Sequence, residues 1–277
     1  MKGAELFVRC LENEGVQRIF GIPGEENLDV MDALLDSSIH FVTTRHVQGA
    51  AFMADVHGRL TGQAGVCLAT LGPGACNLVT GVADANMDRA PLVALAGQAD
   101  TSRMHKESHQ YMDLVGLFAP ISKYSVQIRE PGIIPEVLRK AFKAAETEKP
   151  GVSFVELPEN VADEEVEGAE PLKVQSAQEP LAHPDKVRQA VEIINASEAP
   201  LIMAGNGVCR GKASQELLAF AEQLGIPVAT TFMAKGVFPV SHRLSLGAVG
   251  LQSNDYINCG FDRADVVICV GYDMVEY

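Results

Sequence analysis

The sequence lacks the patterns that mark membrane, secreted and nucleic-acid-binding proteins. Its 277 residues contain no apolar run near the roughly 20 residues that a membrane-spanning helix needs. The first residues show no charged region followed by an apolar block, so we expect no signal peptide. There are 22 lysines and arginines against 36 acidic residues, and the resulting net charge of -14 would repel a phosphate backbone. We therefore expect a cytoplasmic protein that binds neither a membrane nor a nucleic acid.

Metal-site and hydrolase motifs are also missing. The six cysteines form no CxxC pair, and several of them, such as Cys67 and Cys269, lie in apolar runs. Buried thiols explain this distribution better than disulfides or zinc ligands do, which favours a reducing compartment. No GxSxG or HExxH motif occurs. His105 and His109 are spaced to share a helical face, but no third ligand accompanies them, so we expect no metal site at this pair.

Helical and extended patterns alternate along the first part of the chain. Hydrophobic residues make up 47% and charged residues 21%, as in soluble globular proteins, and the length fits about two domains. Continuous apolar strands between helices indicate an α/β fold with a doubly wound parallel sheet that is buried on both faces. The predicted strands are 16–20, 39–43, 65–70, 92–96 and 152–157, and the predicted helices are 4–14, 27–35, 48–60 and one after Gly74.

A change of composition predicts a domain boundary. Residues 162–184 are rich in acidic residues and proline and poor in large apolar residues, which is typical of a linker. We expect one domain over 1–161 and a second α/β domain over 185–277. The expected elements of the second domain are helices at 185–196 and 214–224 and strands at 200–204, 226–230 and 266–270. The chain stops directly after the last strand, with no helix to cover it, so we expect this domain to be incomplete.

Unusual loops follow four of the predicted strands in the first domain. Each loop could be only a tight turn, but four at one edge of a parallel sheet favour a ligand site. The loops are 21–24, 45–49, 70–74 and 97–98. Residues 72–77 also open a helix, whose first N–H groups can bind an acceptor. They match neither a P-loop nor the GxGxxG spacing of a dinucleotide site.

These loops carry a resemblance to a known family. The segments 44–51, 54–62, 65–81, 91–98 and 229–239 resemble thiamine-diphosphate-dependent enzymes of the acetolactate synthase type. The resemblance covers essentially the whole chain. It implies a pyrimidine-binding domain followed by the start of a Rossmann-like central domain, and the chain stops before the family's diphosphate-binding domain.

The resemblance implies an activity, cofactors and an assembly. The activity is that of a carboligase that decarboxylates pyruvate and joins it to a second 2-oxo acid, as in branched-chain amino acid biosynthesis. The cofactors are thiamine diphosphate and Mg²⁺, both completed by the missing carboxyl-terminal domain, so we expect the 277 residues alone to be inactive. Because the family's active site forms between subunits, a homodimer or homotetramer is expected.

The resemblance also implies the residues of the site. The family's glutamate, which shares a proton with the aminopyrimidine, corresponds to Val47, whose isopropyl group can share none. Gln110 corresponds to the active-site glutamine, and His109 precedes it on the side of the substrate. The residues that would line the aminopyrimidine pocket, besides Val47, are Pro23, Gly24, Thr70, Pro73 and Asn77.

Several departures leave alternatives open. His109 and Glu159 replace a phenylalanine and a lysine of the biosynthetic branch, which argues against an FAD-containing biosynthetic enzyme. The glycine-rich segment 205–211 follows a strand, but its spacing fits a structural turn better than a dinucleotide loop. Glyoxylate carboligase is similar in carrying valine at the position of Val47, so a related activity is one alternative. The other is a non-catalytic half-enzyme that binds partner subunits or a nucleotide.

Overall fold

The protein consists of two compact units. Its structure, a computed structural model, describes residues 1–175, 181–250 and 256–276. The units comprise Met1–Glu179 and Pro180–Tyr277. Each contains one sheet, and every strand pair in the two sheets is parallel. The parallel sheets and their helices confirm the predicted α/β class.

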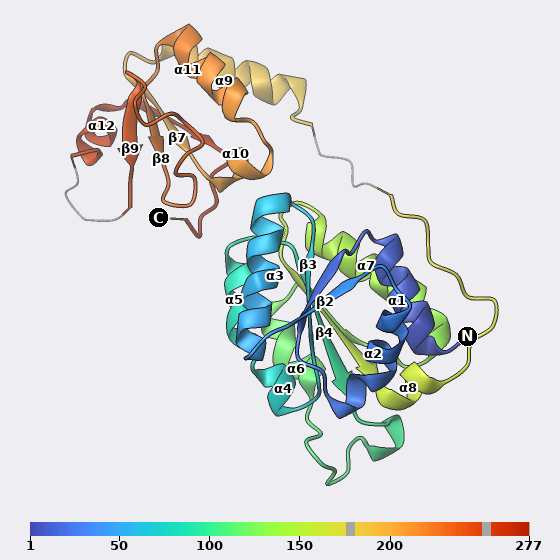
Figure 1. Ribbon diagram of the computed structural model, residues 1–277. Helices are drawn as coiled ribbons and strands as arrows, with labels where there is room; N and C mark the ends of the chain where they lie inside the picture. The colour runs from blue at the N-terminus through green and yellow to red at the C-terminus, as the bar shows by residue number, and fades with distance from the viewer. Residues whose placement is uncertain (176–180, 251–255, 277) are drawn as a thin grey trace. The chain divides into compact units, whose positions relative to one another are not determined.

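The first unit is a six-stranded sheet covered on both faces by helices (Figure 1). Its strands, in the order β2-β1-β3-β4-β6-β5 across the sheet, are β1 (Arg18–Gly21), β2 (His40–Thr43), β3 (Gly65–Ala69), β4 (Leu92–Gln98), β5 (Tyr124–Gln127) and β6 (Val152–Pro158). Its helices are α1 (Gly3–Asn13), α2 (Leu28–Leu35), α3 (Val47–Thr61), α4 (Pro73–Cys76), α5 (Val79–Met87), α6 (Leu114–Phe118), α7 (Ile134–Glu146) and α8 (Glu159–Asp163). Short 3-10 turns occupy Glu25–Asn27, Thr101–Arg103, Ala119–Ile121 and Pro131–Ile133.

The apolar pattern of the sequence explains this arrangement. All residues of β3, β4 and β6 are buried, as expected for central parallel strands between two helical layers. The helices α1, α2 and α7 pack on one face of the sheet, and α3, α5 and α6 pack on the other. Gly15 ends the α1 region at φ +85°, a left-handed conformation that glycine adopts without strain.

The predicted linker begins as part of the first unit. The backbone of residues 164–166 pairs with the start of the chain, because Gly3 donates to the Glu164 carbonyl at 2.9 Å and Val166 donates to the Met1 carbonyl at 2.9 Å. Farther along, Arg9 on α1 pairs with Glu170 at 2.9 Å. The acidic stretch therefore packs along α1 before it leaves this unit. Residues 176–180 of the predicted linker lie outside the described residues.

The second unit is a four-stranded sheet with four described helices (Figure 1). Its strands, in the order β10-β7-β8-β9, are β7 (Pro200–Ala204), β8 (Val228–Thr230), β9 (Ser245–Ala248) and β10 (Val266–Val270). Its helices are α9 (Pro184–Ala196), α10 (Asn206–Arg210), α11 (Ser214–Leu224) and α12 (Asn258–Arg263). The core lies around β7, β8 and α11, whereas α9 has no buried residue and β10 is only half-buried. Among the described residues, no helix has the length and apolar character that a membrane crossing requires.

Candidate functional site

The candidate site lies at the carboxyl edge of the first sheet. The four loops singled out in the sequence follow β1, β2, β3 and β4, which are neighbours in the sheet and run in the same direction. Their carboxyl ends therefore meet at one edge, the usual place for a ligand in an open parallel sheet.

Gly24 and Thr70 are in contact at this edge. A Cβ atom at Gly24 would overlap the Thr70 side chain, so only glycine permits this approach of the β1 and β3 loops. The Thr70 hydroxyl donates a hydrogen bond of 2.8 Å to Oε2 of Glu26, a carboxylate that is 7% exposed. Glu26 was not among the residues predicted for the site. Its signal is the run Glu-Glu-Asn that directly follows the Gly-Ile-Pro-Gly turn.

Gly72 and Gln110 form the second contact. Gly72 has φ +52°, and a Cβ atom there would collide with the Gln110 carbonyl oxygen. Gln110 itself has φ +54°, a left-handed conformation that costs a residue with a side chain roughly 1–2 kcal/mol. The loop that connects β4 to α6 is thus held against the glycine-rich loop after β3. His109 and Gln110 are both exposed on it.

Val47 is the first residue of α3. The preceding residue, His46, caps the helix, because its Nδ1 accepts a hydrogen bond of 3.2 Å from the Gln48 N–H. Val47 is 7% exposed and belongs to an apolar cluster with Phe20 of β1 and Ala50 of α3. The position offers an apolar surface and no proton donor or acceptor.

The other predicted pocket residues lie on the same edge with more solvent contact. Pro23, Pro73 and Asn77 are exposed. The Asn77 side-chain amide donates to the Pro73 carbonyl at 2.9 Å, which ties it to the start of its own helical turn. The structure therefore gives Asn77 a local role in the loop and leaves Pro23 and Pro73 open to a ligand.

The predicted helical pairing of His105 and His109 is wrong. Apart from the 3-10 turn Thr101–Arg103, the segment 99–113 is a loop, and no helix aligns the two rings. His105 instead makes an edge-on ring contact with Tyr111, with centroids 5.9 Å apart. Among the described residues, no group of three or more histidine, cysteine or acidic side chains could hold a metal ion.

A buried polar cluster lies beneath this loop. Glu156 on β6 is 1% exposed and accepts hydrogen bonds from the Gln98 amide at 3.1 Å and from the Gln127 amide. Burial raises the pKa of Glu156, and the two amide hydrogen bonds oppose that effect. The Gln98 amide also donates to the Met112 carbonyl at 3.0 Å. The cluster connects two strand ends to the loop that carries Gln110.

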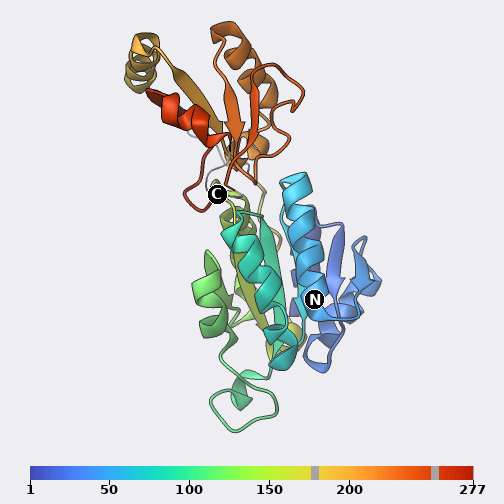
Figure 2. The same cartoon turned by 90° about the vertical axis from the view of Figure 1, so that its left-hand side faces the viewer.

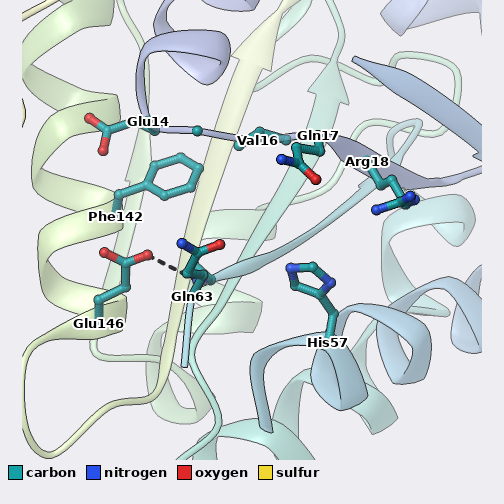
Figure 3. A pocket seen from close by; sticks show the side chains of 10 residues that line it. Glu14, Val16, Gln17, Arg18, His57, Gln63, Phe142 and Glu146 are labelled. Carbon is teal, nitrogen blue, oxygen red and sulfur yellow. Dashed lines mark hydrogen bonds between the residues drawn. The ribbon is translucent and has the colours of Figure 1, made fainter. Parts of the chain in front are cut away.

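A small cavity lies near the other end of the strands (Figure 3). It has a volume of about 20 Å³, room for about one water molecule, and Arg18 at the start of β1 lines it. Glu146 accepts a hydrogen bond of 3.0 Å from the Ala64 N–H just before β3. Because ligands of open parallel sheets bind at carboxyl ends, this cavity is not the candidate site.

Glu14, which lines this cavity, should make the stability of the protein depend on pH. Burial raises the pKa of Glu14 from 4.5 to about 7, although the carboxyl group pairs with Arg139. The folded state therefore binds the proton more tightly, and this contribution is complete below pH 4.5 and is lost as the pH rises through 7. Relative to Glu14→Gln, the wild type should lose at most about 3 kcal/mol of unfolding free energy over this range. Urea titrations at several pH values measure it, and parallel pH profiles of the two proteins would contradict it.

In the second unit, the carboxylate of Glu276 occupies the glycine-rich loop after β7. Glu276 accepts hydrogen bonds from the Asn206 N–H at 2.9 and 3.1 Å, from the Asp273 N–H at 3.0 Å and from the Thr231 hydroxyl. Gly205 and Gly207 pack against the backbone of Gly271, where a Cβ atom on either would collide. Their N–H groups donate to the Val270 and Gly271 carbonyls at 2.8 and 2.7 Å.

Both units of this chain match domains of one enzyme family. Residues 1–117 match the profile of the thiamine pyrophosphate enzyme N-terminal TPP binding domain, and residues 187–277 match that of the central domain. The chain is 44% identical to a probable acetolactate synthase large subunit of Methanocaldococcus jannaschii, over 98% of this chain and 47% of that protein. It is 39% identical to the acetolactate synthase large subunit of Corynebacterium glutamicum, over 98% of this chain and 44% of that protein.

A third relative matches over a similar share of its length. Identity to the acetolactate synthase of Bacillus subtilis is 37%, over 100% of this chain and 49% of that protein. The chain thus spans about half the length of the curated relatives it matches. With the two domain matches and the parallel α/β sheets, the chain belongs to the thiamine pyrophosphate enzyme family.

Proposed function

We propose that this chain is part of a thiamine-diphosphate-dependent carboligase of the acetolactate synthase type. Such an enzyme decarboxylates pyruvate and joins it to a second 2-oxo acid. The proposal rests on two close contacts at one edge of the first sheet. Gly24 contacts Thr70, and Gly72 contacts Gln110. The names of the relatives at 37–44% identity support the same activity.

The residues at this edge fit a flat aminopyrimidine ring. Two glycines allow close approach of the backbone, and buried Val47 offers an apolar surface. When bound, thiamine diphosphate supplies the nucleophilic carbon at which a 2-oxo acid loses CO₂. Val47 can pack against the ring and exclude water, but it moves no proton. Gln110, with donor and acceptor atoms on an exposed loop, can orient the reacting substrate, and His109 lies beside it.

The diphosphate and Mg²⁺ need ligands from outside the described residues. Mg²⁺ prefers oxygen ligands in octahedral geometry. The described residues hold no carboxylate cluster of the necessary size. We infer that a diphosphate-binding domain completes the site, in line with the chain's half-length match to its relatives.

FAD does not fit the second unit at the place where a Rossmann-like domain binds a dinucleotide. A phosphate there needs the free N–H groups of the first glycine-rich turn. In this chain Glu276 already takes the Asn206 N–H, and its negative charge would repel a phosphate. We therefore assign no step to a flavin and infer a structural role for the glycine-rich turn.

We further propose a homodimer or homotetramer in the cytoplasm. The small residues Ala50, Ala51 and Ala54 of α3 do not serve this purpose, because they pack inward, on the first sheet. The helices α3 and α5 lie side by side (Figure 2). Both helices expose large apolar side chains to the solvent. These exposed residues are Phe52, Met53, Val56, Leu60 and Met87.

An exposed apolar surface of this kind is typical of a subunit interface. We expect light scattering to show a concentration-dependent dimer of this chain. A strict monomer at high protein concentration would contradict the assembly.

A direct experiment tests the carboligase proposal. The 277-residue chain, given pyruvate, thiamine diphosphate and Mg²⁺, should form no acetolactate, because the described residues hold no cluster of acidic side chains for the metal. The product of a reading frame that continues past Tyr277 into a diphosphate-binding domain should form it. Acetolactate from the 277 residues alone would contradict the proposed division of the site, and none from the longer protein would contradict the activity.

Val47 favours a second candidate, a carboligase that uses glyoxylate. The buried isopropyl group replaces the acid/base group on which the pyruvate enzymes of the family rely. Parallel assays of the longer protein with pyruvate and with glyoxylate separate the two candidates, since the preferred substrate gives the higher kcat/KM. A branched-chain biosynthetic role follows only if pyruvate is preferred.

A further inference from the structure

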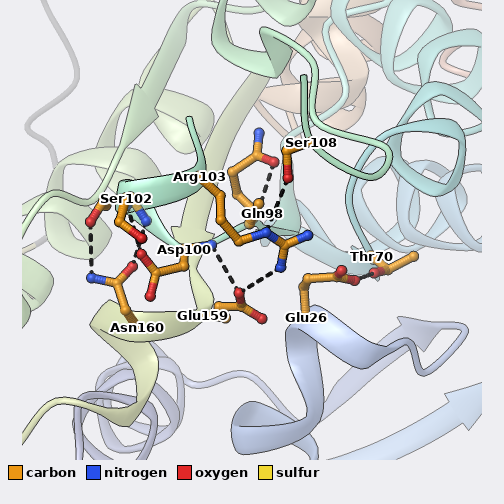
Figure 4. A network of polar contacts seen from close by, with 11 residues as sticks. Glu26, Thr70, Gln98, Asp100, Ser102, Arg103, Ser108, Glu159 and Asn160 are labelled. Carbon is orange, nitrogen blue, oxygen red and sulfur yellow. Dashed lines mark hydrogen bonds and ion pairs between the residues drawn. The ribbon is translucent and has the colours of Figure 1, made fainter. Parts of the chain in front are cut away.

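The loop that carries Gln110 is held on both sides by one short segment. This anchor segment, residues 156–160, contains the end of β6 and the start of α8. Of this segment, the sequence pointed only to Glu159, which replaces a lysine of the biosynthetic branch. Figure 4 shows Glu159 and Asn160 facing the loop at its amino-terminal end, with Arg103 lying between Glu159 and Ser108.

The first connection runs from Glu159 to the residue two before Gln110. Oε1 of Glu159 accepts hydrogen bonds of 3.0 Å from Arg103 Nη1 and 3.0 Å from the Asp100 N–H. The same Arg103 donates through Nε to the Ser108 hydroxyl at 3.0 Å. Arg103 therefore transmits the position of Glu159 to Ser108. Asn160 adds a hydrogen bond of 2.9 Å from the Thr101 N–H.

The second connection runs from Glu156 to the residue two after Gln110. The Gln98 amide nitrogen lies between the Glu156 carboxylate at 3.1 Å and the Met112 carbonyl at 3.0 Å, and donates to both. Glu156 and Gln98 are each 1% exposed, so water competes little with these bonds. Gln110 is thus bracketed at Ser108 and at Met112.

The conformation of Gln110 explains why two connections are needed. A non-glycine residue at φ +54° keeps that conformation only when its surroundings over-determine it. The Gly72 backbone limits Gln110 from one side, and the two brackets fix the chain before and after it. We propose that Glu159, through Arg103, and Glu156, through Gln98, are positioning residues that hold Gln110 at the reacting end of the site. The role given to Gln110 rests on the proposed function, whereas the bracketing does not.

Hydrogen exchange on the 277-residue chain tests the bracketing without any cofactor. Glu159→Ala removes one acceptor from both Arg103 and the Asp100 N–H, and bonds to charged groups of this kind protect amides by about 10- to 100-fold. We expect the hydrogen-bonded amides of Asp100, Thr101, Arg103 and Tyr111 to exchange faster by up to that factor, with those of β3 and β4 unchanged. Glu159→Gln keeps an acceptor oxygen and should show a smaller increase. Glu164→Gln, an exposed acidic residue after α8, is the matched control and should show none.

A double variant with swapped charges and a turnover assay test whether Glu159 positions Gln110. The double variant Arg103→Glu with Glu159→Arg restores an ion pair and should recover part of the protection that Glu159→Ala loses. In the longer protein, Glu159→Ala should lower kcat by about as much as Gln110→Ala does, with the KM for thiamine diphosphate unchanged. Unchanged exchange in the loop of Glu159→Ala would overturn the bracketing.

The same assays distinguish a failure of the positioning role from a failure of the proposed function. A fall in kcat with Gln110→Ala but not with Glu159→Ala would overturn the positioning role and leave the carboligase intact. If Gln110→Ala changes no turnover, the assignment of Gln110 fails, and with it the claim that the brackets serve catalysis. The exchange data then decide the bracketing alone.

Discussion

Val47→Glu should speed exchange of the thiamine C2 proton by about 10²–10⁴-fold, the usual contribution of a well-placed acid/base group. The measurement needs a protein that carries this chain with a diphosphate-binding domain, loaded with thiamine diphosphate. A carboxylate at the first residue of α3 could form a short, charge-assisted hydrogen bond to the aminopyrimidine. The buried valine that stands there can form none.

The matched control is Val47→Gln, which has the shape of glutamate and no exchangeable carboxyl proton. Quenched NMR of C2–H exchange should show the acceleration in Val47→Glu and little of it in Val47→Gln. Carboligation is measured separately with pyruvate and with glyoxylate, because a faster first step can coincide with a slower overall rate when a later step limits turnover. Equal exchange in the wild type and in Val47→Glu would mean that Val47 does not face the ring.

Arg59→Met should lower the unfolding free energy of the first unit by about 3 kcal/mol at neutral pH. Arg59 on α3 binds Asp55 at 2.8 Å, and it also binds Asp84 at 3.0 Å and Asp88 at 2.8 Å on and beside α5. The Asp55 side chain is 3% exposed, and burial raises its pKa. Removal of the guanidinium leaves that carboxylate buried without its cation, which is the costly outcome for a buried ion pair.

Denaturant titration measures this loss, and two comparisons make it specific. Arg129→Met replaces an exposed arginine of the same unit and should cost far less. The loss in Arg59→Met should shrink at low pH, where Asp55 is protonated and needs no cation. Addition of Asp55→Asn to Arg59→Met should recover part of the stability. A loss that is equal at all pH values would contradict the buried-charge explanation.

Much of the fold could be predicted because the central strands are apolar throughout. The strands β3, β4 and β6 follow from apolar runs, and the helix α1 follows from the helical spacing of its apolar residues. The strand β5 was missed, because Tyr124–Gln127 mixes polar and apolar residues and is only partly buried at the sheet edge. The strand β9 was missed for the same reason, since all four of its residues are partly buried.

The edge that carries the site could also be predicted, but its contacts could not. Parallel strands place their following loops together, whatever the side chains are. The hydrogen bond from Thr70 to Glu26 joins residues 44 positions apart, and nothing in either local sequence selects the partner. The pairing of His105 with His109 failed because a four-residue spacing has meaning only in a helix. The brackets around Gln110 likewise depend on three separate segments.

The proposed site places Val47 against the aminopyrimidine of thiamine diphosphate. Methyl-labelled valine in a cofactor-loaded protein that carries this chain tests it by NMR, with Val47→Ala to assign the signal. We predict nuclear Overhauser contacts from the Val47 methyl protons to the pyrimidine protons, and a shift of the Val47 methyl signals when the cofactor is added. A Val47 methyl signal that neither moves nor shows such contacts, while the cofactor is bound, would contradict the claim.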